Sequence, residues 1–396
     1  MLDETIITGS YDRSAAPPKV YGFKYPAEED SQDKPLSSMD VIGIIGKTQK
    51  VVNQYSAEEK RKVSVLIPCR NEVQYIERCI NSVYSFDPPQ GGFEVIVIDG
   101  MSTDGTRELL LRLKNQFPDL VVMDNSRKIV PSAMNLGIQN AKGEYIVRAD
   151  VRCIHPRSYL CDLIELSERT GADNVGGVLV PISGETYVQK SIALAYKSRI
   201  AMGGALRDRG DFVGETDTVY GGCFKRKRLL EIGMYDEAMV RNQDDELSFR
   251  LRERGGKIIQ DGRIKVQYWP RRFYWQLFKQ FLQYGYWKIP VIKKHPQQAS
   301  PRHFLPAGFV LGLTFLAVAS FADWRFLLGL GIYSGSYLFS IGLESFRLSR
   351  KESLRLWPGV LVSIILIHIS FGIGFVVSLI CRCIKIKPKY FETLSR

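Results

Sequence analysis

The chain has 396 residues, 45% of them hydrophobic, and its 54 Lys and Arg against 42 Asp and Glu give a formal net charge of +12. This composition excludes a disordered chain and leaves room for one α/β domain with an accessory apolar region. The positive charge indicates an anionic partner, which can be nucleic acid, an anionic membrane surface or a phosphorylated substrate, although surface solvation explains it equally well. The seven cysteines form no Cys-x-x-Cys pair, so neither a zinc site nor a disulfide framework is indicated, and a reducing compartment fits best.

The N-terminal part of the chain gives few signals of secondary structure. Residues 1–61 begin with a polar stretch that lacks the pattern of a signal peptide, and they are expected to form a flexible cytosolic leader. A small apolar patch from Val41 to Ile45 predicts a helix that packs on the main domain.

From Lys62 the pattern alternates between strands and helices. The apolar runs VSVLIP, FEVIVID and LVVMD have strand length, and helical spans at about 72–84 and 106–115 separate them. This alternation predicts a parallel sheet with right-handed crossovers, so the fold class is α/β for a domain that covers residues 62–262. The sheet continues at EYIVRAD (144–150), residues 171–222 are predicted to be rich in loops, and a helix containing DELSFRLRERG then ends at Gly255 and Gly256.

Beyond this domain the composition changes. Residues 263–303 are predicted to form interfacial amphipathic helices, because PRRFYWQLFKQFLQYGYWK (270–288) interleaves aromatic rings with Arg and Lys. Nucleic-acid binding would use the same residue types. Three apolar spans at about 304–322, 326–343 and 356–381, each close to the ~20 residues that cross a bilayer, favour a membrane region and no nucleic acid. The alternative is a large soluble all-α domain.

The charges that flank these spans give conflicting orientations. The loop between the second and third spans is basic, which places it in the cytosol with the α/β domain. The tail 382–396 is also basic, yet three full crossings would put it outside. Either one span is re-entrant or the positive-inside rule fails here. His368 in the third span is either functional or a neutral side chain satisfied by a neighbouring helix.

Carboxylates and glycines follow the strands, at the edge where an α/β sheet builds its ligand crevice. Asp99 ends FEVIVID and can accept a hydrogen bond from a base or ribose, and Ser102 and Asp104 lie in the turn that follows. The alternative for this segment is an ordinary Asp/Gly loop that caps a helix. A nucleotide-sugar enzyme also needs a divalent ion for the leaving diphosphate and a base for the acceptor hydroxyl.

VSVLIPCRNE (63–72), VIVIDGMSTDGT (95–106) and NQDDELSFRL (242–251) resemble the inverting family 2 glycosyltransferases. VPSAMNLGIQNAKGEYIVRAD (130–150), DTVYGGCFKRKRLLEIGMYDE (217–237) and PRHFLP (301–306) extend the resemblance to bacterial succinoglycan-type exopolysaccharide glucosyltransferases. It covers about residues 62–306. It implies a GT-A fold, a nucleoside-diphosphate-sugar donor, a divalent cation and a lipid-linked saccharide acceptor.

The resemblance places Pro68, Arg70, Glu72 and Asp99 at the nucleotide. Asp150 matches the last carboxylate of the Asp-x-Asp metal motif, and it would hold Mg²⁺ or Mn²⁺ with waters and substrate phosphates. The first position of that motif is Arg148, so a second interpretation is that Arg148 or Arg152 offsets the diphosphate charge directly. Asp150 could also be an ordinary helix-capping or salt-bridged residue.

Asp244 matches the catalytic base of the family, with Gln243 in place of a Glu, and Asp245 and Glu246 add negative charge that raises its proton affinity. The alternative is that these acids merely complement a helix dipole. On the acceptor side, we expect Gly221 and Gly222 from the resemblance, and also Glu246. The resemblance also implies Gln280 and Tyr284 from a segment similar to the Gln-x-x-Arg-Trp site of processive synthases, in which Gln283 stands at the Arg position.

The sequence therefore predicts a membrane-anchored inverting glycosyltransferase of exopolysaccharide biosynthesis. It would add one sugar, glucose from UDP-glucose, to a polyprenyl-diphosphate-linked acceptor by direct in-line attack. The expected location is the cell inner membrane, with several crossings and a cytosolic catalytic domain. The alternatives are a processive β-glycan synthase and a donor-binding membrane scaffold with little or no turnover.

Overall fold

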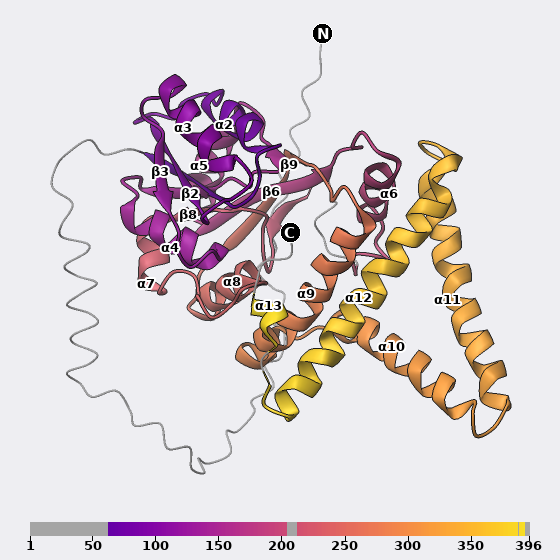
Figure 1. The fold of residues 1–396 in the computed structure, drawn as a ribbon. Coiled ribbons are helices and arrows are strands. Elements are labelled where there is room, and N and C mark those ends of the chain that lie inside the picture. The colour runs from indigo at the N-terminus through magenta and orange to yellow at the C-terminus, as the bar shows by residue number, and fades with distance from the viewer. Residues whose placement is uncertain (1–61, 204–211, 387, 393–396) are drawn as a thin grey trace, which may run out of the picture. The chain divides into compact units, whose positions relative to one another are not determined.

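The computed structural model describes residues 62–203, 212–386 and 388–392 (Figure 1). The predicted leader 1–61, with its packing helix, lies outside the described residues. All described residues belong to one compact unit that extends from Ala57 to Arg396.

The strands of the described residues form one sheet in the order β3-β2-β1-β4-β8-β6-β9-β5, with β7 paired to β9. Four parallel strands make up one half: β1 (Val63–Cys69), β2 (Phe93–Asp99), β3 (Val121–Asp124) and β4 (Tyr145–Arg148). In the other half, β8 (Cys223–Lys225) runs antiparallel to β4 and to β6 (Asn174–Pro181), and β6 is parallel to β9 (Ile258–Tyr268). The short strands β5 (Cys153–Ile154) and β7 (Val213–Glu215) pair antiparallel with β9. The predicted α/β class is confirmed as a mixed, mostly parallel sheet, and β9 extends past the predicted domain boundary at residue 262.

Helices cover both faces of this sheet, because the strand residues alternate between the two faces. Val63, Val65 and Ile67 of β1 pack in one core with α2 (Ile76–Tyr84), α3 (Thr106–Gln116) and α5 (Tyr159–Thr170). Leu66 of β1 packs in the other with α4 (Val130–Asn140), α7 (Arg226–Glu231) and α8 (Gln243–Glu253). Both cores hold the carboxyl ends of β1, β2 and β4 in fixed positions.

Residues 171–222, predicted to be rich in loops, also contain regular elements that the sequence pattern did not indicate. This stretch contains β6 and α6 (Tyr187–Tyr196), which begins with a capping box formed by Thr186 and Gln189. The glycines of β6 hid the strand from the sequence pattern. They are needed because β9 approaches closely: a Cβ on Gly177 would lie 2.1 Å from the carbonyl oxygen of Ile264.

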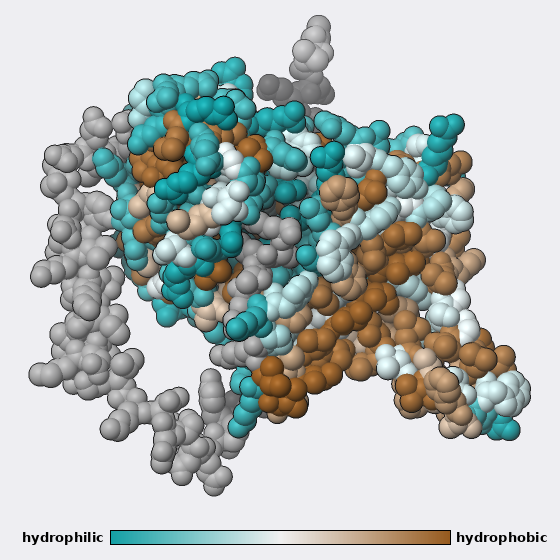
Figure 2. All heavy atoms as spheres, viewed as in Figure 1, coloured by the Kyte–Doolittle hydropathy of each residue, from teal (hydrophilic) through white to brown (hydrophobic). Residues whose placement is uncertain are grey.

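The C-terminal part consists of α9 (Tyr274–Lys294), α10 (Pro301–Ala319), α11 (Arg325–Ser349), α12 (Trp357–Cys383) and α13 (Lys389–Glu392). Three helical segments are long and apolar enough to cross a membrane: Pro301–Ala319, Arg325–Ser349 and Leu354–Cys383. Their apolar side chains form a broad hydrophobic surface in Figure 2, whereas the surface around the sheet is mostly hydrophilic.

Helix α9 packs along α12 at very close range. A Cβ on Gly285 of α9 would lie 2.0 Å from the carbonyl oxygen of Phe371, and a Cβ on Gly374 of α12 would lie 2.0 Å from that of Leu282. Ten of the 21 residues of α9 are buried, so one side of this helix packs against protein and not against lipid. Phe273 and Trp275, which are 57% and 60% exposed, keep the predicted aromatic character at the start of this helix.

Candidate active site

The loops after β1 and β2 are tied together by side chains. The fully buried carboxylate of Asp99 accepts hydrogen bonds from the backbone N–H of Ser102 at 3.0 Å and from its hydroxyl. The Ser102 hydroxyl in turn accepts the backbone N–H of Asn71 at 2.8 Å, and the Asn71 side chain accepts the N–H of Thr103 at 2.9 Å. These bonds make a rigid rim at the carboxyl ends of two adjacent parallel strands. Sequence reasoning missed Asn71.

Asp104 supports the same rim from the start of α3. Its carboxylate accepts the backbone N–H groups of Val73 at 3.2 Å and of Thr106 at 3.1 Å. Asp104 thus stabilises the turn just before α3, whose N-cap residue is Gly105. A donor-binding role for Asp104 stays a prediction.

A cavity of about 880 Å³ opens beside this rim. It brings together most of the predicted site residues, namely Pro68, Glu72, Arg148, Asp150, Gly221, Asp244, Asp245, Gln280 and Tyr284. The other predicted residues are not among those that line this cavity: Arg70, Asp99, Ser102, Asp104, Gly222 and Glu246.

Arg148 lies between two carboxylates in this cavity. Its Nε is 2.8 Å from Asp150, and its Nη1 is 2.6 Å from Asp244, which comes from the first turn of α8. Burial opposes the charge on Arg148, but Asp150 and Asp244 outweigh this effect and raise its pKa, so the guanidinium stays charged. The end of β4 and the start of α8 are thus joined by one cation.

The Asp244 carboxylate faces the cavity, and 44% of its side chain is accessible there. Because protein surrounds the cavity, the carboxylate is partly removed from bulk water, and this burial raises the pKa of Asp244 above its usual value. Arg148 partly offsets the rise, whereas Asp150 and Asp245 add to it. A carboxylate with a raised pKa binds a proton more readily, as a general base must.

The residues available for a metal ion are few. Among the described residues, no group of three or more His, Cys, Asp or Glu side chains could hold an ion together. Asp150 is the one predicted ligand, and it shares its oxygen with Arg148. Glu72 is ion-paired with Arg152 at 3.0 Å, and Arg152 stacks over the ring of Tyr75. The donor set thus suits at most an ion that takes its other ligands from water and substrate phosphates.

The next two acids of α8 point to different places. Asp245 faces the cavity and pairs with Lys288 of α9 at 2.6 Å. Glu246, which was expected on the acceptor side, is not among the residues that line the cavity: its side chain is 3% exposed and is paired with Arg250 at 2.8 Å. Two helical positions turn a side chain by about 200°, so Asp244 and Glu246 cannot share a face.

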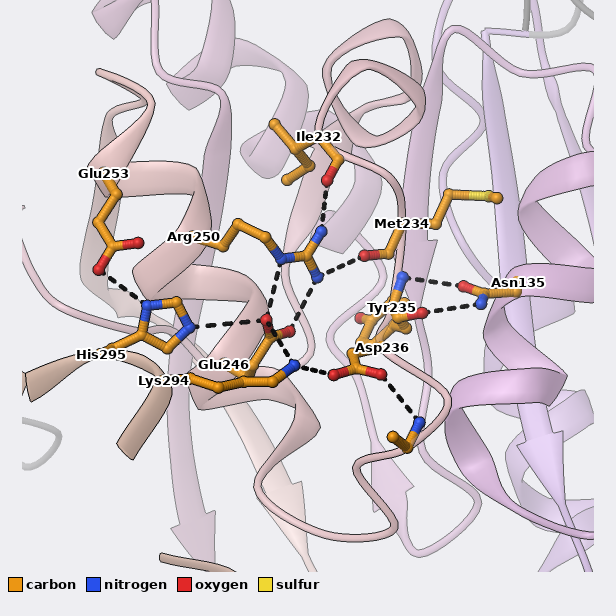
Figure 3. A network of polar contacts seen from close by, with 11 residues as sticks. Asn135, Ile232, Met234, Tyr235, Asp236, Glu246, Arg250, Glu253, Lys294 and His295 are labelled. Atoms are coloured by element: carbon orange, nitrogen blue, oxygen red, sulfur yellow. Dashed lines mark hydrogen bonds and ion pairs between the residues drawn. The ribbon is translucent and has the colours of Figure 1, made fainter. Parts of the chain in front are cut away.

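Figure 3 shows the network in which Glu246 lies. Arg250 links Glu246 to the backbone carbonyls of Ile232 and Met234, and Lys294 and His295 approach the same carboxylate at 3.8 and 3.6 Å. Lys294 also pairs with Asp236. Because Lys294 ends α9 and His295 follows it, this network fixes the C-terminal end of α9 to α8.

On the acceptor side, two glutamines of α9 hold two arginines. The side-chain oxygen of Gln280 accepts a hydrogen bond from Nε of Arg271, and that of Gln283 accepts one from Nε of Arg241, both at 3.0 Å. Gln280 also donates to the Tyr284 hydroxyl at 3.0 Å. Sequence reasoning did not place Arg241 or Arg271 in the site. The Arg-rich start of 270–288 was a usable signal, but it was assigned to lipid contact.

The far wall of the cavity comes from the apolar helices. Leu305 and Pro306 of α10 and Ile367 and Phe371 of α12 line it. His368 also lines it, and its two ring nitrogens lie 3.0 Å from the Tyr337 hydroxyl and 3.1 Å from the carbonyl oxygen of Ile200, so it is satisfied by neighbouring groups. The cavity therefore extends from the sheet edge to helices that could lie in a membrane.

Residues 64–232 match the model of glycosyl transferase family 2. This match assigns residues 64–232 to the family 2 glycosyltransferases. The succinoglycan biosynthesis protein ExoA of Rhizobium meliloti is 29% identical over 276 residues, which are 69% of this chain and 83% of the relative. A dolichyl N-acetyl-α-D-glucosaminyl phosphate 3-β-D-2,3-diacetamido-2,3-dideoxy-β-D-glucuronosyltransferase of Methanococcus voltae is 25% identical over 328 residues, covering 80% of this chain and 97% of the relative.

The same fold is present in the mannosyltransferase PcManGT of Pyrobaculum calidifontis, solved with GDP-Man and Mn²⁺. The match has a TM-score of 0.50 and 18% sequence identity, and it covers 86% of this chain and 94% of that chain. The predicted family, fold and enzyme class are thus confirmed.

Proposed function

We propose that this glycosyltransferase adds one sugar from a nucleotide-sugar donor to a lipid-linked saccharide. The observation that carries the proposal is the extent of the cavity, which joins Asp150 and Asp244 to apolar residues of α10 and α12. A lipid-linked acceptor can reach such a cavity from the membrane while its sugar lies beside the carboxylates.

The acceptor class has support from two relatives. The name of the Methanococcus protein describes transfer to a sugar on dolichyl phosphate, and the Rhizobium protein is named for succinoglycan biosynthesis. We infer a polyprenyl-diphosphate-linked saccharide as the acceptor in exopolysaccharide synthesis, and UDP-glucose as the donor that the resemblance implies.

We assign the general base to Asp244. The acceptor hydroxyl gives its proton to this carboxylate while its oxygen forms the new bond to C1 of the donor sugar, and the bond between C1 and the diphosphate oxygen breaks. The nucleoside diphosphate leaves on the opposite face, so the configuration at C1 inverts. Arg148 holds the carboxylate in place and stays charged throughout.

We propose that Asp150 holds a divalent cation, Mn²⁺ or Mg²⁺, together with the donor diphosphate. Such an ion would supply positive charge for the leaving diphosphate. The structural neighbour was solved with Mn²⁺. Because Asp150 is a single carboxylate already bonded to Arg148, we expect weak binding of the ion in the absence of donor.

For the membrane we propose that α10 and α11 cross it and that α12 lies along the catalytic domain. The start of α12 contacts α6, where the N–H of Gly359 bonds to the Tyr187 hydroxyl at 3.0 Å. Near its end, Cys381 packs in a cluster with Phe249 of α8. A helix that touches the catalytic domain at both ends does not carry one end to the other side of a bilayer.

This arrangement removes the conflict between the two basic segments. The loop before α12 contacts α6, since Lys197 pairs with Glu352 at 2.9 Å and the Tyr187 hydroxyl donates to the carbonyl oxygen of Arg355 at 3.1 Å. The tail returns to α9, where Trp287 donates to the carbonyl oxygen of Phe391 at 2.9 Å. Both basic segments then lie on the cytosolic side of the inner membrane with the catalytic domain.

The test is transfer by purified protein with radiolabelled UDP-glucose and a bacterial lipid extract, followed by sizing of the lipid-soluble product. A product larger by one sugar supports the proposal, and a ladder of longer products would instead identify a processive synthase. Arg148 at the metal motif favours one other candidate, a donor-binding scaffold. Nucleotide binding without transfer from any donor of a broad panel would support that candidate.

A further inference from the structure

We propose that Arg241 and Arg271 form a subsite for the diphosphate group of the lipid acceptor. Lys288 and Arg302 add positive charge to the lining of the same cavity. The proposal rests on the proposed function, because it assumes that the acceptor is a lipid diphosphate. It assigns a role to residues outside the donor site and the catalytic carboxylates.

The first argument is how the two guanidinium groups are held. Each places its Nε–H on the side-chain oxygen of a buried glutamine, Arg271 on Gln280 and Arg241 on Gln283. An amide oxygen orients a guanidinium without cancelling its charge. The planar fork has five N–H donors, which suit the oxygens of a phosphate. Similar synthases have an Arg at the position of Gln283. Here Gln283 instead binds Arg241, which comes from the segment before α8.

The second argument is the crowding of positive charge. Burial, together with the neighbouring cations Arg271 and Arg148, lowers the pKa of Arg241 to about 10. Lys288 is 8% exposed and Arg302, on the first turn of α10, also lines the cavity. Lys288 pairs with Asp245 and Arg302 pairs with Asp217. These two cations therefore contribute to the electrostatic potential of the cavity more than to direct contacts with a ligand. A diphosphate between Arg241 and Arg271 would relieve their mutual repulsion.

The third argument is position. Arg241 lies two residues before α8, which carries Asp244, and Arg302 is three residues from Leu305, which lines the apolar wall. The cations thus belong to elements that lie between the catalytic carboxylate and the apolar helices. The donor diphosphate is expected beside Asp150 at the end of β4. A lipid acceptor bound in this way would place its first sugars toward Asp244 and its chain toward α10 and α12.

The experiment measures equilibrium binding of three probes to the full-length protein in detergent. Farnesyl diphosphate carries both lipid and diphosphate, farnesol lacks the diphosphate, and inorganic diphosphate lacks the lipid. UDP and GDP report the donor site separately. The variants are Arg241→Gln, Arg271→Gln and the charge-keeping Arg271→Lys. Arg272→Gln is the matched control, because Arg272 is the exposed neighbour of Arg271 and is not among the lining residues.

We expect the unaltered protein to bind farnesyl diphosphate more tightly than either partial probe. Arg241→Gln and Arg271→Gln should each weaken it about tenfold or more, as for a lost charge-assisted hydrogen bond. Arg271→Lys should lose less, Arg272→Gln should lose nothing, and nucleotide binding should stay the same in all variants. If Arg241→Gln does not fold, Arg271→Gln, in the segment between β9 and α9, carries the test.

Two results would overturn the subsite. One is farnesyl diphosphate binding that is absent in the unaltered protein or equal in all variants. The other is a parallel loss of nucleotide affinity, which would assign these arginines to the donor diphosphate. Failure of the proposed function looks different: neither UDP nor GDP would bind, whereas the lipid diphosphate would still depend on Arg241 and Arg271.

Discussion

Nη1 of Arg148 lies 2.6 Å from the carboxylate of Asp244, and this contact joins the end of β4 to the start of α8. Arg148 occupies the position at which the Asp-x-Asp motif has its first carboxylate. The protein therefore has a fixed cation beside its proposed base, where a metal ligand would otherwise stand. This contact opposes the rise that burial causes in the pKa of Asp244, and it places positive charge near the proposed donor site.

Arg148→Gln should shift the pH dependence of transfer. Burial already raises the pKa of Asp244, and Arg148 opposes that rise, so removal of the cation should raise the pKa further. A base must be deprotonated, so the rate falls as the pH drops through this pKa, and the acid limb of the rate profile should move to higher pH. The measurement is the transfer rate across the acidic range at saturating donor. Arg148→Lys, which keeps the charge, should shift less, and an unmoved acid limb in Arg148→Gln would contradict the assignment.

Glu246→Ala should lower the stability of the fold, because Glu246 has a structural role and not a chemical one. The change leaves Arg250, whose side chain is 17% exposed, without its carboxylate partner, and the cost in fully buried pairs, about 3–5 kcal/mol, is an upper bound here. Thermal unfolding in detergent measures it. Glu253→Ala is the control on the same helix: Glu253 is 38% exposed and pairs with His295, so its loss should cost less than about 1 kcal/mol. Equal unfolding temperatures of the two variants would refute the structural role of Glu246.

The sequence predicted the parts of this molecule that depend on local pattern. Alternating apolar residues located β1 and β2, and the run of acids located the start of α8. Contacts between distant segments were beyond its reach. Nothing local indicates that Gln283 holds Arg241, 42 residues away, or that Gly374 lets α12 approach α9. Helix geometry alone is enough to predict that Asp244 and Glu246 lie on different faces of α8.

The proposed course of α12 predicts the side of the membrane on which Cys383 lies. Cys383 is the exposed one of the seven free cysteines, and Cys161 is half-buried in the catalytic domain. In a Cys161→Ser background, a membrane-impermeant maleimide should label Cys383 from the side that holds the catalytic domain. A cysteine at Ala322, between α10 and α11, should be labelled from the other side. If Cys383 is labelled only from the side that also labels the Ala322→Cys variant, α12 crosses the membrane and the proposed course is wrong.

Removal of divalent ions should reduce transfer, and Asp150→Ala should make the remaining activity insensitive to Mn²⁺. Asp150 is the single carboxylate proposed for the ion, so its loss leaves only phosphate and water ligands. The measurement is the transfer rate against Mn²⁺ concentration after treatment with EDTA. Full activity of the unaltered protein in EDTA would show that arginines alone offset the diphosphate charge.

The central claim is that Asp244 accepts the proton of the acceptor hydroxyl, and Asp244→Asn tests it most directly. The amide keeps the size of the side chain but cannot act as a base, so transfer of labelled sugar to the lipid extract should fall about a hundredfold or more. Nucleotide binding should be retained, and Glu253→Gln on the same helix should transfer at the normal rate. Transfer by Asp244→Asn at the rate of the unaltered protein would contradict the account.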